Sequence, residues 1–322
     1  MHKMRVAVLR GGPSTEYDVS LVTGGNVLRA LQNKYHTKDI LIDKDGVWHM
    51  DGLPTHPEKA CRHVDVVFNA MHGEYGEDGK VQQILNLLSV PYTGSGAAAS
   101  SMAMNKATTK QIFSRHGIKT PMGMVFDSEL SPSEIAHSTF RKISPPWIVK
   151  PVNGGSSVGT SIARNFEELG RAVINAFGYG NSVLMEEFIS GREATCGVID
   201  NFRGQKNYSL LPVEIIKPKH RDFFDYECKY DGTSKEICPG NFDSSAKEEI
   251  QNLAMKIHNA MGLRHYSRSD FIVTPRRGIY ALEVNTLPGL TPESLFPKSL
   301  AAIGCKYEHF LDHLINLALE SK

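Results

Sequence analysis

The stretch that decides the fold runs from Asp270-Phe271-Ile272-Val273, through a turn, to Tyr280-Ala281-Leu282-Glu283-Val284-Asn285-Thr286-Leu287-Pro288-Gly289. Side chains alternate between the two faces of a β-strand, so Glu283 and Asn285 point the same way, and Asp270 on a neighbouring strand adds a third oxygen. Two carboxylates and an amide oxygen suit Mg²⁺, which in such sites keeps waters and binds substrate phosphates. The stretch therefore predicts a metal site linked to a nucleotide. A solvated hairpin surface is the alternative.

The composition is that of an ordinary globular chain. Its 322 residues, 41% of them hydrophobic, are enough for about two domains, or three small ones. The 36 Lys and Arg residues against 35 Asp and Glu leave a net charge of +1, which indicates no broad surface for nucleic acid or an anionic membrane. The first apolar run, Val6 to Leu9, is too short for a signal peptide, so we expect a cytoplasmic protein. Five cysteines without Cys-x-x-Cys spacing indicate free thiols.

Alternating apolar runs, loops and amphipathic segments predict a mixed α/β fold in three units. A small doubly wound α/β unit is expected first, and a helix over residues 97–115 then carries the chain into an α+β unit and a third, strand-rich unit. The predicted limits of the three domains are 1–104, 105–191 and 192–322. The elements expected within them are strands at 5–10, 64–70, 147–151 and 182–189, and helices at 19–32, 80–88, 166–176, 244–261 and 307–319.

The loop from Gly154 to Gly159 has the composition of a phosphate-binding loop. It is rich in backbone N–H groups and small hydroxyls that can wrap around a phosphate, although a flexible surface turn has the same composition. The chain contains no Walker A string, so a lysine must come from elsewhere, and Lys150 at the end of the preceding strand is placed to reach phosphate oxygens. Gly94-Ser95-Gly96 lacks the strand and the downstream acid of a dinucleotide site.

Three further segments have both a functional and a structural interpretation. Glu186-Glu187-Phe188-Ile189 can bind the amine and flat face of a nucleotide base, or form an edge strand. His72 follows an apolar strand at the edge where doubly wound sheets bind ligands, or caps the next helix. Residues 217–239 form a long segment with few strand signals, which indicates a lid or a disordered loop.

Together these residues resemble the D-alanine–D-alanine ligase family of the ATP-grasp superfamily. The likeness extends from Val6 to the last helix and is carried, in order, by GGPSTEYDVS, MHGEYGEDG, PYTGSG, MNK, VKPVNGGSSVG, FFDYECKY, SRSD and EVNTLPGLTPESL. It implies an N-terminal Rossmann-like (pre-ATP-grasp) domain that binds substrate, followed by central and C-terminal ATP-grasp domains with ATP between their sheets. It also implies the joining of two D-alanine molecules through an acyl phosphate for peptidoglycan precursors, and a homodimer.

The resemblance implies a complete nucleotide and metal site. Phosphate contacts fall on Lys106, Lys150 and Lys229, and the closing loop contains Ser156, Ser157 and Gly159. The residues implied to hold adenine and ribose are Glu186, Phe188, Ile189 and Glu193. Those implied to hold two Mg²⁺ or Mn²⁺ ions are Asp270, Glu283 and Asn285.

The resemblance also implies roles around the amino acids. Glu16, with His72 nearby, matches the carboxylate that receives the ammonium of the first D-alanine, and Ser294 and the backbone around Leu290 match positions that hold the carboxylate of the second. Arg268 and the Gly289 N–H face the acyl phosphate and the oxyanion. Tyr230 matches a lid residue that hydrogen-bonds with Ser156 and Glu16 when the site closes.

Two other functions are compatible with much of this pattern. A D-alanine–D-lactate ligase shares the fold and the ATP chemistry, but Tyr230 within DYECKY favours the dipeptide product. A catalytically silent nucleotide-binding protein of the same fold would have lost a metal ligand or a phosphate lysine, whereas this chain has Asp270, Glu283, Asn285, Lys106 and Lys150.

Overall fold

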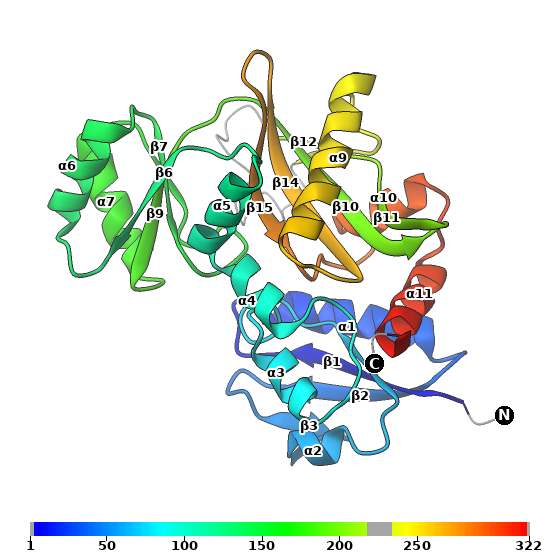
Figure 1. The fold of residues 1–322 in the computed structure, drawn as a ribbon. Coiled ribbons are helices and arrows are strands. Elements are labelled where there is room, and N and C mark those ends of the chain that lie inside the picture. The colour runs from blue at the N-terminus through cyan, green and yellow to red at the C-terminus, as the bar shows by residue number, and fades with distance from the viewer. Residues whose placement is uncertain (1–2, 218–233, 321–322) are drawn as a thin grey trace.

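The computed structural model of the protein describes residues 3–217 and 234–320, which form three sheets and the helices that cover them. In Figure 1 the N-terminal sheet lies at the bottom, the central unit at the left and the C-terminal sheet at the upper right. The mixed α/β architecture in three units agrees with the prediction from sequence. The limits of the domains stay a prediction.

The N-terminal unit is built on a sheet of order β4-β3-β2-β1-β5, whose central strand β1 pairs in parallel with β2 and β5. Helices cover both faces: Val6 and Val8 of β1 pack in one cluster with α1, whereas Ala7 and Leu9 pack in another with α3. The doubly wound prediction is therefore confirmed, but β2 to β4 were not predicted. The elements are β1 (Arg5–Gly11), α1 (Tyr17–Leu31), β2 (His36–Ile42), β3 (Trp48–Met50), β4 (Leu53–Thr55), α2 (Pro57–Ala60), β5 (Val66–Asn69) and α3 (Lys80–Leu87).

The predicted single helix over residues 97–115 is wrong, because two helices occupy this range. They are α4 (Ala97–Met104) and α5 (Lys106–Arg115), separated by Asn105 in an extended conformation. The Asn105 side chain accepts a hydrogen bond from the Thr108 N–H at 2.9 Å and so caps α5. The break places Lys106 at the first position of α5, where its N–H donates to the Val152 carbonyl at 2.9 Å.

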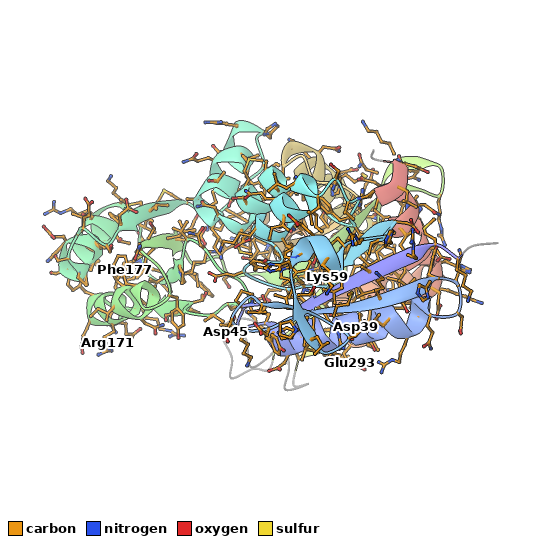
Figure 2. All side chains as sticks on the ribbon, turned by 90° about the horizontal axis from the view of Figure 1, so that it is seen from below. Asp39, Asp45, Lys59, Arg171, Phe177 and Glu293 are labelled. Atoms are coloured by element: carbon orange, nitrogen blue, oxygen red, sulfur yellow. The ribbon has the colours of Figure 1, made fainter. Side chains whose placement is uncertain are left out.

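The central unit is an antiparallel sheet of order β6-β9-β7-β8, packed against two helices that stand apart from the other units. In Figure 2 Arg171 and Phe177 on this unit lie well away from Asp39 and Lys59 on the N-terminal unit. The predicted strand at 182–189 ends at Glu187, so Phe188 and Ile189 follow it as a connection. The elements are β6 (Gly123–Asp127), α6 (Pro132–Lys142), β7 (Trp147–Pro151), β8 (Ser161–Ala163), α7 (Phe166–Phe177) and β9 (Ser182–Glu187).

The C-terminal unit is a sheet of order β13-β12-β10-β14-β15, with β11 paired to β10 and helix α9 packed against it. Both predicted helices are confirmed to within one residue at each end. The elements are β10 (Arg192–Phe202), β11 (Gln205–Ser209), β12 (Val213–Ile216), β13 (Lys235–Ile237), α9 (Ser244–Ala260), β14 (Tyr266–Thr274), β15 (Gly278–Asn285), α10 (Leu295–Ala302) and α11 (Tyr307–Glu320).

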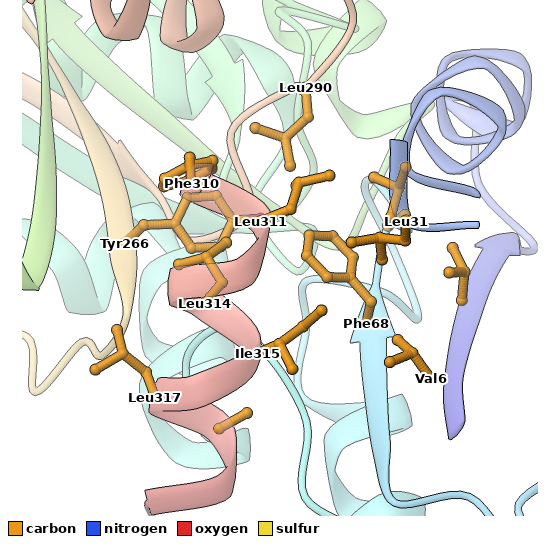
Figure 3. Packing of buried hydrophobic residues seen from close by; sticks show 14 of the residues in the cluster. Val6, Leu31, Phe68, Tyr266, Leu290, Phe310, Leu311, Leu314, Ile315 and Leu317 are labelled. Carbon is orange, nitrogen blue, oxygen red and sulfur yellow. The ribbon is translucent and has the colours of Figure 1, made fainter. Parts of the chain in front are cut away.

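The last helix, α11, packs between the N-terminal and C-terminal units. Figure 3 shows its side chains between two parts of one core, with Phe310 beside Tyr266 of β14 and Ile315 beside Phe68 of β5. The Tyr266 and Phe310 rings lie 5.7 Å apart in an edge-to-face arrangement. The N-terminal and C-terminal sheets therefore share a hydrophobic core, which fixes the position of one sheet relative to the other.

The expectation of free thiols is borne out for the described cysteines Cys61, Cys196, Cys238 and Cys305, while Cys228 lies outside the described residues. Within residues 3–217 and 234–320, none of the helices has the length and apolar character needed to span a bilayer.

Candidate active site

Two adjoining cavities lie where the three units meet. The larger, about 850 Å³, is lined by residues from all three units, and the smaller, about 420 Å³, lies between the central and C-terminal sheets. Sizes of this order accommodate small molecules and cofactors. The residues that line both cavities are Lys106, Gly155, Arg268, Leu282, Glu283 and Leu295.

The residues that line both cavities form a wall that the two cavities share. The pairing of β14 with β15 brings the predicted metal ligands to this shared wall. Asp270 lies opposite Glu283 in the register, and Arg268 lies opposite Asn285. Glu283 and Asn285, two residues apart on β15, line the same cavity, which agrees with the alternation of side chains along a strand. Asp270 lines the smaller cavity, Asn285 the larger, and Glu283 both. In the described parts of the chain no group of three or more His, Cys, Asp or Glu residues could hold a metal; the predicted set, with two carboxylates and one amide, stays a prediction.

Arg268 and Thr195 hold the Asp270 carboxylate in place. The Arg268 guanidinium donates to its two oxygens at 3.0 and 3.1 Å, and the Thr195 hydroxyl donates to Oδ1 at 2.6 Å. Burial lowers the pKa of Arg268, but the charges of Asp270 and Glu283 outweigh this and raise that pKa, so the guanidinium stays protonated. A fixed cation therefore lies between the two cavities.

Residues of the Gly/Ser loop line both cavities: Gly154 and Ser156 line the larger, Ser157 lines the smaller, and Gly155 lines both. Its role as a phosphate loop stays a prediction. The Ser156 hydroxyl donates to Glu16 Oε1, and the Lys106 ammonium donates to the Gly154 carbonyl at 2.6 Å. Ser156 and Ser157 have φ of +49° and +59°, a left-handed conformation that non-glycine residues adopt at a cost. A Cβ on Gly155 would lie 3.0 Å from Glu16 Oε2, so the loop needs glycine at this close approach. Gly159, at the other end, has φ +72°.

His72 belongs to a buried polar chain beneath Glu16. Its exposed fraction is 5%, and its Nε2 lies 2.9 Å from the Thr23 hydroxyl while Nδ1 lies 3.4 Å from Glu77 Oε1. Burial raises the pKa of Glu77 to about 7, with a further contribution from the Glu16 charge. Burial lowers the pKa of His72, but Glu77 outweighs it and the pKa rises. His72 lines the larger cavity, and the glycine before α3 is Gly79, so His72 does not cap that helix.

The smaller cavity is closed at one end by a buried carboxylate with two lysines. Glu186 of β9 is 2% exposed, and its Oε2 lies 2.6 Å from the Lys150 ammonium while Oε1 contacts Lys110 of α5. Glu193, whose carboxylate lies 2.8 Å from the Lys217 ammonium, lines the same cavity. The predicted nucleotide residues found along this cavity are Lys106, Lys150, Ser157, Glu186, Phe188, Ile189 and Glu193.

The far end of the larger cavity is formed by the loop that follows β15. The Ser294 hydroxyl lies 2.8 Å from that of Thr291, and a Cβ on Gly289 would lie 2.8 Å from the Ser294 Oγ. Gly289 and Ser294 line the cavity, whereas the Leu290 side chain is buried in the core that contains α11. Lys229 and Tyr230, predicted lid residues, lie outside the described residues, as does most of the predicted lid.

Sequence reasoning missed Glu77 and Lys110. Both have a local signal: Glu77 follows His72 by five residues in MHGEYGEDG, and Lys110 follows Lys106 by four within one helix. Residues four apart share a helix face, so Lys106 pointed to Lys110 as a neighbour.

Family models match most of the chain. The model for the D-ala D-ala ligase C-terminus matches residues 112–316, and the model for the N-terminus matches residues 5–59 and 51–95. The chain belongs to the D-alanine–D-alanine ligase family. This confirms the resemblance that the eight motifs indicated.

Relatives of this ligase family match the whole chain. A D-alanine–D-alanine ligase of Syntrophobacter fumaroxidans is 38% identical over 99% of this chain and 98% of its own length. Another, of Halalkalibacterium halodurans, is 37% identical over 98% of this chain and 100% of its own length.

Solved structures of ligases have the same fold. The VanG D-Ala:D-Ser ligase of Enterococcus faecalis has a TM-score of 0.85 at 30% identity and covers 98% of this chain and 100% of its own. The D-alanine-D-alanine ligase of Coxiella burnetii also has a TM-score of 0.85, at 27% identity, over 100% of this chain and 95% of its own. The expected three-unit ATP-grasp architecture agrees with these neighbours.

Proposed function

We propose that this chain is an ATP-dependent D-alanine–D-alanine ligase that forms D-alanyl-D-alanine through an acyl phosphate, releases ADP and phosphate, and supplies peptidoglycan precursors. The observation that carries the proposal is the shared wall of the two cavities. With a nucleotide in the smaller cavity and amino acids in the larger, the terminal phosphate and the reacting carboxylate would meet at Arg268, Glu283 and Lys106. Family membership supports ATP and D-alanine as the substrates.

The nucleotide end of the site would hold ATP by its base, ribose and phosphates. Glu186 would accept a hydrogen bond from the base amine, with Phe188 and Ile189 against the ring and Glu193 at the ribose. Lys106 and Lys150 would contact the phosphates, and the loop with Ser156, Ser157 and Gly159 would close over them. Lys229, outside the described residues, would add a third phosphate contact.

Asp270, Glu283 and Asn285 would hold two Mg²⁺ or Mn²⁺ ions. The donor set fits such ions, because all three side chains offer hard oxygen ligands along the shared wall. Ions bound there would neutralise part of the charge of the triphosphate during phosphoryl transfer.

The larger cavity would bind the two amino acids. Glu16, held by Ser156 and beside the buried His72, would receive the ammonium of the first D-alanine, and Ser294 with the backbone around Leu290 would hold the carboxylate of the second. Phosphorylation makes the first carboxylate an electrophile, which the amine of the second D-alanine then attacks. Arg268 and the Gly289 N–H would stabilise the resulting oxyanion. Water would hydrolyse the acyl phosphate, so closure by the segment that carries Tyr230 would protect it.

We further propose a cytoplasmic homodimer without nucleic-acid or membrane partners. The net charge of +1 supports the absence of nucleic-acid and membrane partners, because it offers no broad surface for anionic polymers or lipids. The measurement is sedimentation equilibrium of the purified chain, where a mass of one protomer would contradict the dimer.

The test of the proposed function is a product assay that offers competing nucleophiles. Purified protein with ATP, Mg²⁺ and D-alanine at neutral pH should release one phosphate per D-alanyl-D-alanine formed. D-lactate and D-serine should then be added in equal amounts, the latter because a structural neighbour is a D-Ala:D-Ser ligase. The dipeptide should remain the main product. A product dominated by D-alanyl-D-lactate or D-alanyl-D-serine would overturn the assignment, and no nucleotide turnover would favour a silent protein.

A further inference from the structure

Lys110 is the one member of the Glu186, Lys150 and Lys110 cluster that has no role in the proposed chemistry. It lies on α5, while Glu186 and Lys150 lie on the neighbouring strands β9 and β7. Its ammonium contacts Glu186 Oε1 and also donates to the Thr120 hydroxyl at 2.6 Å. Glu186 and Lys150 line the smaller cavity. Lys110 does not line it and contacts the same carboxylate from helix α5.

The charges of this cluster are unequal at direct contact. One carboxylate faces two ammonium groups, and all three side chains are nearly removed from solvent, at 2%, 10% and 11% exposure. The charge of Glu283 also favours both ammonium groups, but the carboxylate in contact with them is Glu186, and one lysine already pairs with it. A second buried cation at this contact is therefore costly unless it is needed. Burial lowers the pKa of Lys110 even though the charge of Glu186 raises it, and this net lowering reflects the cost of burying the second cation.

The two lysines differ in their anchors and in their access. Lys110 contacts both Thr120 and Glu186, whereas the Lys150 ammonium contacts Glu186 from the wall of the smaller cavity. A triphosphate in that cavity would attract Lys150 away from Glu186. Without Lys110, the carboxylate would then be a buried charge with no cation in contact, and it would take up a proton or turn away.

We propose that Lys110 is a positioning residue that keeps Glu186 charged and directed at the amino group of the nucleotide base while Lys150 contacts the phosphates. This assignment rests on the proposed function for the identity of the nucleotide. Lys110 thereby determines the preference for a purine with a 6-amino group over one with a 6-oxo group. A charged acceptor favours the amine donor and repels the oxo group.

The test measures binding of ADP and IDP in the presence of Mg²⁺, by calorimetry, since these nucleotides differ at that position of the base. The wild-type chain should bind ADP at least tenfold more tightly than IDP. Lys110→Met should reduce this ratio to about threefold or less, and Lys110→Arg, which keeps the charge, should restore part of it. Lys150→Met should weaken both nucleotides while keeping the ratio, because Lys110 still holds Glu186.

Kinetics supply a second measurement. Lys110→Met should raise the KM for ATP while leaving the KM for D-alanine within about twofold, because the amino acids bind in the other cavity. Lys142→Met is the matched control, since Lys142 is exposed on α6, and it should behave as wild type.

Several outcomes would overturn the assignment. Equal binding of ADP and IDP by the wild type, or an unchanged ratio in Lys110→Met with only a lower Tm, would leave Lys110 a purely structural role. If Lys110→Met does not fold, Thr120→Val removes only the hydrogen bond and should lower the ratio; no change would sink the proposal. Because ADP binding requires no ligation, a chain that discriminates as expected but forms no dipeptide would overturn the proposed function alone.

Discussion

At the scale of single residues, the proposed metal site predicts that the charge of its carboxylates matters more than their shape. Asp270→Asn preserves size but removes one negative charge from the shared wall, next to Arg268 and Glu283. We expect turnover to fall more than about 100-fold, because phosphoryl transfer depends on correctly placed charge. The measurement is steady-state phosphate release with saturating ATP and D-alanine.

Asp39→Asn is the matched control for Asp270→Asn. It makes the same exchange in an ion pair with Arg10 on β1, neither residue of which lines a cavity, and should keep wild-type turnover. In Asp270→Asn the Arg268 guanidinium loses its buried charged partner, which can lower the stability of the fold. Thermal unfolding of both variants therefore separates an effect on turnover from an effect on folding. Wild-type turnover in Asp270→Asn would remove the metal assignment.

At the scale of elements, the break between α4 and α5 positions Lys106, a proposed phosphate contact. Asn105 caps α5 and its amide donates to Asn153 Oδ1 at 3.2 Å, so Lys106 begins a helix that is held next to the Gly/Ser loop. Asn105→Ala should lower the free energy of unfolding by about 1 kcal/mol, because the cap is lost. It should also raise the KM for ATP, since Lys106 is no longer fixed. Urea unfolding and initial rates measure the two effects.

Asn165 provides the matched control for the cap. Its side chain caps α7 with the same geometry, accepting from the Glu168 N–H at 2.9 Å, on a helix that lines neither cavity. Asn165→Ala should therefore cost similar stability with no change in the KM for ATP. Asn105→Asp, which can still cap, should recover most of the stability. Equal KM changes in the two alanine variants would contradict a special role for the α5 cap.

At the scale of the whole molecule, a buried histidine joins the N-terminal and C-terminal units. His265 Nδ1 accepts the Gly94 N–H at 3.0 Å, so this nitrogen must be unprotonated. Burial, with Arg264 adding to it, lowers the pKa of His265 to about 3, below its usual value of 6.5. The stability that neutral His265 contributes is fully present above its unfolded pKa near 6.5. This contribution to the free energy of unfolding is lost as pH falls toward 3, by at most about 1.4 kcal/mol per pH unit.

The measurement is urea unfolding of wild type and His265→Asn at pH 7.5, 6.0 and 5.0. Asparagine tolerates the left-handed backbone at φ +68° and offers an acceptor that does not titrate, so the variant should lose less stability than wild type on acidification. His63→Asn makes the same exchange at an exposed position with φ +61° and controls for the substitution itself. Parallel pH dependence in wild type and His265→Asn would show that the pKa of His265 is not lowered by folding, and would contradict the prediction.

Local patterns determine those parts of the molecule that depend on neighbours in sequence. Strand alternation placed Glu283 and Asn285 on one face, glycine and serine content singled out a loop whose residues line the cavities, and helical periodicity located α9 and α11 to within one residue. The single helix over 97–115 was wrong because a lone Asn105 cap breaks an otherwise continuous helical pattern.

The tertiary structure alone decided which distant residues meet. Helix α11 packs on β5 about 240 residues earlier in the chain, and His265 accepts a hydrogen bond from Gly94. Lys110 became a site residue in the same way, because long-range packing carried it to Glu186. Periodicity and composition describe a residue's neighbours along the chain, whereas burial, charge pairing and cavity shape arise only when separate elements close around a common core.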